Sequence, residues 1–136
     1  MAGGLLLEIV TPERRVLAER VDEVVLPSVE GSMGVLPGHA PLLARLEAGE
    51  VSYRVGDVRR FLAVSGGHAE VLRDAVNVLA RTAERAEEID VERARRAKDG
   101  AQTALQNAKA ESEFRRGEIR LERAIARLEV GGRSRR

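Results

Sequence analysis

The first half of the chain alternates between short apolar runs and Gly or Pro punctuation. The glycines and prolines recur about every eight to ten residues, and the runs between them are rich in Val and Leu. Short strands at that spacing are typical of an all-β sandwich or barrel rather than of alternating strands and helices. The expected strands cover residues 5–10, 16–19, 23–27, 32–36, 42–47, 49–55, 57–65, 68–72 and 75–80.

Two connections between these strands contain residues suited to tight turns. Gly56-Asp57 fits a two-residue hairpin turn, and Arg73-Asp74 fits the reversal before the last strand. Both turns predict antiparallel neighbours. Within residues 75–80, Val76 and Val78 fall on the same face of a strand, and this face is expected to close the core.

From Thr82 onward the chain changes to a helical composition. It contains no proline and is dominated by Ala, Glu and Arg, which favour helices. Two helices are expected, the first capped by Asp90 and the second running from about Ser112, a candidate cap, to Val130, where Gly131-Gly132 ends it. Their apolar stripes are Val91, Ala94, Ala97, Ala101, Leu105 and Ala108, then Phe114, Gly117, Leu121, Ala124, Ile125 and Leu128.

A hairpin joined through residues 107–111 would bring the two stripes together, but their small side chains bury little apolar area. Burying such a seam contributes little stabilising free energy compared with the conformational entropy that the helices lose when they become ordered. We therefore expect the hairpin to settle with help from a nucleotide, the sandwich or another chain. The expected fold is α+β with two segregated domains: an all-β N-terminal sandwich or flattened barrel in residues 1–86 and a C-terminal α-helical hairpin in residues 87–136.

The composition argues against several kinds of chemistry. Cysteine is absent, only two histidines are present, and no Gly-x-x-x-x-Gly-Lys-Ser/Thr phosphate loop occurs. From these features we expect no catalytic residue and no metal site. No segment approaches the roughly 20 apolar residues of a membrane span, which favours a soluble cytoplasmic protein.

The net charge of +1 hides an asymmetry between the two halves. Residues 1–88 carry 14 acidic and 10 basic side chains, whereas residues 89–136 carry 8 acidic and 13 basic ones. The basic half and its tail Arg133-Ser134-Arg135-Arg136 raise nucleic-acid binding as one interpretation. Phe114 is the only aromatic residue there and acidic residues are interleaved, so no nucleic-acid partner is expected.

Two motifs in the first half carry a resemblance to a known family. Residues 25–41 read VLPSVEGSMGVLPGHAP and residues 64–71 read VSGGHAEV. Both resemble the epsilon subunit of bacterial F-type ATP synthases, although His68 replaces the usual apolar or aromatic residue. The resemblance implies docking of the sandwich on the gamma stalk and the c-ring through Glu30, Ser32, Met33, Gly38 and His39. Alternatively, His39 hydrogen-bonds within its own loop and Met33 belongs to the core.

A third motif, IDVERA at residues 89–94, is similar to the segment by which some epsilon subunits bind ATP. By resemblance, ATP is a regulatory ligand held between folded-down helices and the sandwich by Glu84, Ile89, Asp90, Arg93, Ala94, Arg123 and Arg127. The three arginines would converge on the phosphates. Alternatively, Asp90 is only an N-cap and the arginines form a solvated face. Gly100 stands where some ATP-binding members have a further arginine.

The resemblance implies a non-catalytic rotor subunit at the cytoplasmic face of the cell membrane, within a proton-translocating ATP synthase. ATP would favour a compact hairpin. Without ATP the helices would extend along gamma, meet the catalytic beta and alpha subunits and inhibit ATP hydrolysis, and the basic half suits acidic surfaces there. The alternative is a purely structural rotor subunit without nucleotide sensing.

Overall fold

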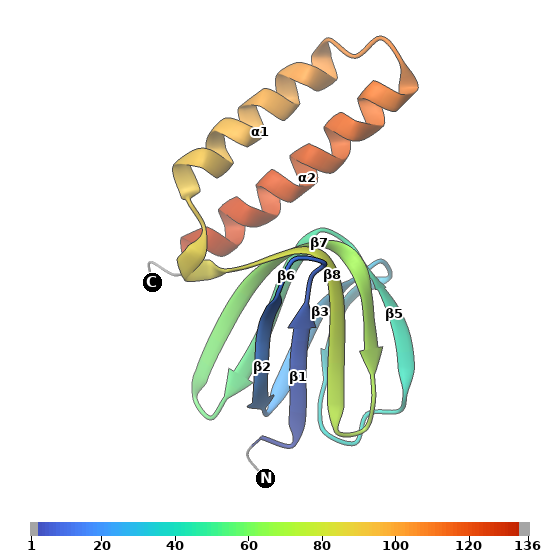
Figure 1. Ribbon diagram of the computed structural model, residues 1–136, viewed down its shortest axis with the longest axis vertical. Coiled ribbons are helices and arrows are strands. Elements are labelled where there is room, and N and C mark those ends of the chain that lie inside the picture. The colour runs from blue at the N-terminus through green and yellow to red at the C-terminus, as the bar shows by residue number, and fades with distance from the viewer. Residues whose placement is uncertain (1–2, 134–136) are drawn as a thin grey trace.

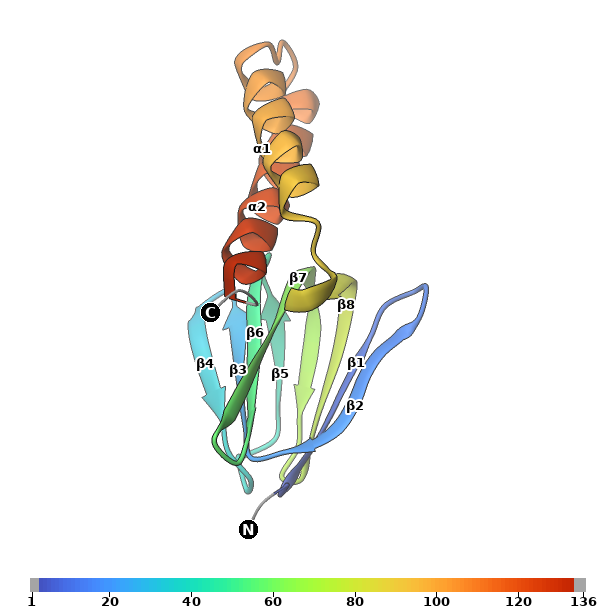
Figure 2. The same ribbon diagram turned by 90° about the vertical axis from the view of Figure 1, so that its left-hand side faces the viewer.

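The computed structural model describes residues 3–133, in which the strands gather at one end and two helices at the other (Figures 1 and 2). A 3₁₀ turn, η1 Ala86–Glu88, leads from the strands to α1 Val91–Gln106 and α2 Glu111–Arg133. The fold class expected from the sequence is confirmed. The strands are β1 Leu5–Val10, β2 Arg15–Val21, β3 Glu23–Ser28, β4 Gly31–Val35, β5 Leu42–Leu46, β6 Gly49–Val55, β7 Val58–Val71 and β8 Ala75–Arg85.

The sheet closes into a ring because β6 pairs with two strands that do not pair with each other. The order is β2-β1-β8-β7-β5-β3-β4, and β6 pairs with both β3 and β7. The resulting sandwich is a flattened barrel around an aliphatic core, so its stability rests on branched side chains rather than on rings. Among the most buried side chains are Leu5, Leu7, Ile9, Leu26, Leu62, Val76 and Val78.

The long strand β7 bends at Gly66-Gly67, where the sequence predicted a break. The φ angles are 68° at Gly66 and 113° at Gly67, a region that residues with side chains avoid. Before the bend β7 pairs with β6, and after it with β5, while pairing with β8 keeps one register throughout. The expected strands 57–65 and 68–72 are therefore one strand, because hydrogen bonds to β8 hold both segments in line.

β8 is also longer than expected, because it follows β7 across that bend. It runs Ala75–Arg85, whereas the sequence predicted residues 75–80. Both expected turns are present: Gly56 starts the β6–β7 turn with a φ of 60°, and Leu72 N–H donates to the Ala75 carbonyl at 2.8 Å across the β7–β8 turn. On its other edge β8 pairs in parallel with β1, so the sandwich is not antiparallel throughout.

The two helices begin differently from one another. Asp90 caps α1 as expected, since its carboxylate accepts a hydrogen bond from Arg93 N–H at 3.1 Å. The predicted cap of α2 at Ser112 is wrong. Phe114 N–H already donates to the Ala110 carbonyl, which places Ser112 inside the first turn.

The predicted end of α2 at Gly131-Gly132 is also wrong, because the helix continues to Arg133. A Cβ on Gly131 would lie 2.9 Å from Val91 Cγ2 and 3.1 Å from Ile89 Cγ2. The α2 backbone thus lies directly against the start of the hairpin. Gly131 serves this close approach rather than helix termination.

The seam between α1 and α2 is narrow. A Cβ on Gly117 would lie 2.9 Å from Leu105 Cδ2, so the helices approach closely at that point. Phe114 and Ile125 were expected in the apolar stripe but are 48% and 36% exposed. The buried seam residues are Ala94, Ala101, Gly117 and Ala124.

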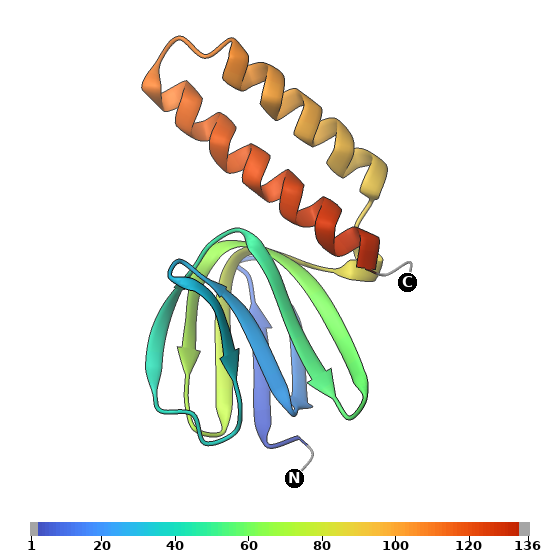
Figure 3. The same cartoon turned by 180° about the vertical axis from the view of Figure 1, so that it is seen from behind.

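The hairpin stands on one end of the sandwich and rests on it through α2 (Figures 1 and 3). The C-terminal end of α2 packs against β6, β7 and η1, while the connection between the helices lies farthest from the strands.

Gly67→Ala is expected to destabilise the sandwich by about 2 kcal/mol or more. The added Cβ would lie 2.0 Å from the Leu79 carbonyl oxygen, at a φ of 113°. Urea unfolding measures the change. Gly34→Ala is the control, since a Cβ there meets nothing within 4 Å. Equal unfolding midpoints for the two variants would contradict the assigned bend.

Candidate functional site

A small apolar cluster, separate from the sandwich core, connects the hairpin to the strands. It is referred to below as the joint. Val130 of α2 is fully buried in it, and Ile89, which precedes α1, is 8% exposed. The hairpin is therefore fixed to the sandwich near one end of α2, and beyond that end it depends on its own narrow seam. The joint consists of Ala63, Ala86, Ile89 and Val130, with Phe61 and Val91 packed against them.

Two ion pairs flank the joint. Arg127 Nε lies 2.7 Å from Glu84 Oε1, and both side chains are largely shielded, with 16% and 27% exposure. Arg133 Nε lies 2.6 Å from Glu50 Oε2, and its guanidinium lies 4.8 Å from the centre of the Phe61 ring. Contacts of this kind each contribute on the order of 1 kcal/mol. They orient α2 on the strands.

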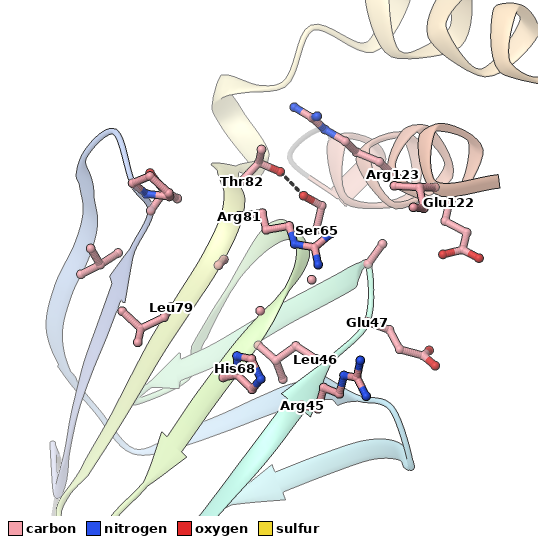
Figure 4. A pocket seen from close by; sticks show the side chains of 18 residues that line it. Arg45, Leu46, Glu47, Ser65, His68, Leu79, Arg81, Thr82, Glu122 and Arg123 are labelled. Carbon is pink, nitrogen blue, oxygen red and sulfur yellow. Dashed lines mark hydrogen bonds between the residues drawn. The ribbon is translucent and has the colours of Figure 1, made fainter. Parts of the chain in front are cut away.

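A groove of about 1230 Å³ separates α2 from the outer face of β5, β7 and β8 (Figure 4). Leu79 and Ile119 line it as exposed apolar side chains, 62% and 48% exposed. The hydroxyls of Ser65 and Thr82 hydrogen-bond to each other within it. The groove is charged as well as apolar, because it is also lined by Arg45, Arg81 and Arg123 and by Glu47 and Glu122.

The structure brings some of the expected ATP residues together and separates others. Glu84 and Arg127 form the ion pair beside the joint, and Arg123 lines the groove. Arg93 is exposed on α1, and no residue of α1 lines the groove. Asp90 is occupied as the N-cap of α1.

The remaining two expected ATP residues are buried inside the protein and pack against other residues. Ile89 is buried in the joint, and Ala94 is completely buried in the seam between the helices. Within residues 3–133, the seven expected ATP residues do not line one pocket in this arrangement of the helices.

The expected docking residues are spread along the β3–β4 hairpin and the loop that follows. Glu30 and Ser32 are exposed at the end near the helices, where Ser28 pairs with Leu46. Gly38 lies at the opposite end, where its N–H donates to the Arg73 carbonyl in the β7–β8 turn at 2.7 Å. The predicted surface therefore runs along one edge of the sandwich rather than forming a single cluster.

The two ambiguous docking residues have contacts within the chain. Met33 is half-buried and packs against the sandwich core. The Nδ1 atom of His39 lies 2.7 Å from the Ala40 carbonyl oxygen in its own loop. Both side chains keep some exposure, so each can also contact a partner.

Sequence reasoning missed Glu50, Phe61 and Arg133 as residues that hold the hairpin, and it missed Arg81 in the groove. Glu50 and Arg133 are 83 positions apart. No periodic pattern links residues at such a separation, so only the fold could pair them. Arg81 had one local signal, since it continues the outward-facing series Asn77 and Leu79 that alternates with the buried residues of β8.

Neither metal chemistry nor a membrane span is indicated. Within the described part of the chain, no three His, Cys, Asp or Glu side chains are grouped so that they could hold a metal ion. None of the helices described has the length and apolar character needed to cross a membrane. The described residues form a sandwich that carries a helical hairpin.

Both halves of this architecture match one protein family. Residues 5–86 match the beta-sandwich domain of the ATP synthase delta/epsilon chain, and residues 87–132 match its long alpha-helix domain. The chain belongs to this family, as the sequence motifs predicted. A relative from Syntrophobacter fumaroxidans named ATP synthase epsilon chain is 52% identical over 96% of this chain and 97% of its own length. The epsilon chain of Nitratidesulfovibrio vulgaris is 47% identical over 97% and 98%.

Solved structures of ATP synthases contain chains of similar fold. One in the Euglena gracilis mitochondrial enzyme, determined with OSCP, F1 and the c-ring, has a TM-score of 0.82 and 29% identity, covering 95% of this chain and 81% of that one. A chain in the Tetrahymena thermophila central stalk and c-ring structure has a TM-score of 0.67 and covers 94% of this chain and 96% of that one. At 13% identity it shows the fold alone.

Val130→Ala is expected to loosen the hairpin without loosening the sandwich. Removing two methyl groups from the joint costs roughly 2 kcal/mol, and that loss falls on the attachment of α2. Amide hydrogen exchange of α1 and α2 should accelerate by about tenfold or more, while β7 and β8 exchange as before. Ile125→Ala is the control, because Ile125 lies on α2 outside the joint. Equal acceleration in strands and helices would refute an independent joint.

Proposed function

We propose that this chain is a non-catalytic rotor subunit of an F-type ATP synthase, linking a gamma subunit to the c-ring at the cytoplasmic face of the membrane. The observation that carries the proposal is its 52% identity, over 96% of its length, to a protein named ATP synthase epsilon chain. The structurally similar Euglena chain comes from a complex that includes F1 and a c-ring. Both halves of the fold match the same family, which supports a role for the whole chain.

The proposed docking surface for gamma and the c-ring follows the β3–β4 edge of the sandwich. Its polar contacts are Glu30, Ser32 and His39, with Met33 and Gly38 between them. Val29 and Leu36 lie at its two ends and are 45% and 55% exposed. Exposed apolar side chains beside polar ones are the composition of a protein interface.

The proposed regulatory function of the hairpin is inhibition of ATP hydrolysis, with ATP favouring the compact state. The joint fixes only one end of α2, and the seam buries mainly Ala and Gly, so the outer hairpin can leave the sandwich at low cost. ATP shifts such an equilibrium by its difference in affinity for the two states. In the extended state the exposed arginines of both helices would meet the beta and alpha subunits.

One observation favours a second candidate, a purely structural rotor subunit. Asp90 caps α1, Ile89 fills the joint and Ala94 fills the seam. These positions account for three of the six residues of the IDVERA motif without a nucleotide. The two candidates share the docking surface and differ only in the response of the helices to ATP.

The docking proposal predicts a complex with a gamma subunit from a family enzyme. Glu30→Arg combined with His39→Glu should weaken this complex about tenfold, because both changes reverse or add charge at the docking edge. Size-exclusion chromatography and calorimetry measure the affinity. Glu13→Arg is the control, since Glu13 is exposed in the β1–β2 turn away from that edge. A wild-type chain that forms no complex with gamma would overturn the proposal.

The regulatory proposal predicts that ATP changes the NMR spectrum of both helices in the isolated protein. Arg93→Gln should weaken the interaction about tenfold or more, because it removes a charge-assisted hydrogen bond to phosphate. Arg96→Gln, also exposed on α1, should have little effect. If millimolar ATP shifts no helix resonance, the structural rotor subunit remains as the function.

A further inference from the structure

The arginines that line the groove, Arg45, Arg81 and Arg123, form no ion pair among the described residues. At the same end of the sandwich, Arg127 and Arg133 are each paired with a glutamate. Arg81 on β8 and Arg123 on α2 have neither an ion pair nor a side-chain hydrogen bond within residues 3–133. Unpaired guanidinium groups retain their full capacity for binding an anion.

These two arginines approach the same space from opposite walls. Both line the main groove, and both also line a smaller adjoining hollow of about 210 Å³. The Arg81 side chain lies over the bend in β7, since a Cβ on Gly66 would be 3.5 Å from Arg81 Nε. Figure 4 shows Arg81 beside Ser65, and Arg123 extending from α2 on the side of Thr82.

Hydroxyl groups and the absence of a side chain at the bend complete the surroundings of Arg81. Ser65 and Thr82 bring two hydroxyls into the groove, hydrogen-bonded to each other across β7 and β8. Gly66 has no side chain next to them, and the Arg81 side chain lies against it. Guanidinium groups and hydroxyls are groups that proteins use to bind phosphate.

Carboxylates nearby do not cancel this positive charge. Glu47 and Glu122 also line the groove, but Figure 4 shows both pointing away from Arg81. In the smaller hollow, Glu84 is held by Arg127, and the other lining carboxylate, Glu13, shares the hollow with three arginines, Arg14, Arg81 and Arg123. The space between Arg81 and Arg123 is therefore the part of the groove best suited to an anion.

We propose that Arg81, on the sheet side of the groove, binds the phosphate groups of a nucleoside di- or triphosphate opposite Arg123. This inference rests on the proposed nucleotide response and adds a binding residue from the sandwich, whereas the motif residues other than Glu84 come from the helical half. A polyphosphate held at both walls bridges β8 and α2. Binding then directly stabilises the compact position of the hairpin, because the ligand contacts both bodies only when they are close.

The test is calorimetric titration of the full chain with ATP and, separately, with inorganic tripolyphosphate. Arg81→Gln is expected to weaken both ligands about tenfold or more, the effect of losing a charge-assisted hydrogen bond. Arg81→Lys, which keeps the charge but not the paired donors, should fall between that variant and wild type. Arg73→Gln is the matched control, because it removes the same charge from the opposite end of β8, in the β7–β8 turn.

The outcomes separate this inference from the proposed function. If Arg81→Gln binds ATP as wild type does while Arg93→Gln binds it weakly, the nucleotide response stands and the role of Arg81 is refuted. If neither ATP nor tripolyphosphate binds the wild-type chain, both proposals fail. Weakening of both ligands by Arg81→Gln but not by Arg73→Gln supports the site. Chemical-shift changes at Ser65 and Thr82 on adding tripolyphosphate support the location.

Discussion

Packing of Val130 and Gly131 against Ile89 and Val91 decides how the two halves of this chain are connected. The contact is small, and it lies at the last turns of α2. Because Gly131 has no side chain, α2 lies directly against the start of the hairpin and the helix continues where its glycines would otherwise end it. Beyond the joint, α1 and α2 are held to each other by a seam of small residues. The fold thus combines a rigid closed sandwich with an appendage attached at one place.

The strand β7 provides the rigid counterpart to this attachment. Before its bend at Gly66-Gly67 the strand pairs with β6, and after the bend it pairs with β5. This change of partner closes the sandwich. The same bend lines the groove and lies beneath the Arg81 side chain. A single local feature of the strand therefore shapes both the core and the surface that faces α2.

Charge is distributed in two ways around the joint. Arg127 and Arg133 are engaged with carboxylates of the sandwich and orient α2. Arg81 and Arg123 face the groove without such partners among the described residues. The first pair resists movement of the hairpin, while the second is available to a ligand. In the proposed regulation these two contributions oppose each other, and a ligand can shift the hairpin only if its two states differ little in free energy.

The sequence by itself determined the elements whose signals are local. Gly-bounded apolar runs located the strands, Asp90 marked the start of α1, and the Ala and Gly stripe predicted the seam. Motifs identified the family, although they did not show that Ile89 would be buried. Only the tertiary structure decided that β7 is continuous, that α2 passes Gly131, and that Glu50 meets Arg133. These outcomes depend on contacts between residues far apart in the chain, which override local preference and leave no periodic trace in the sequence.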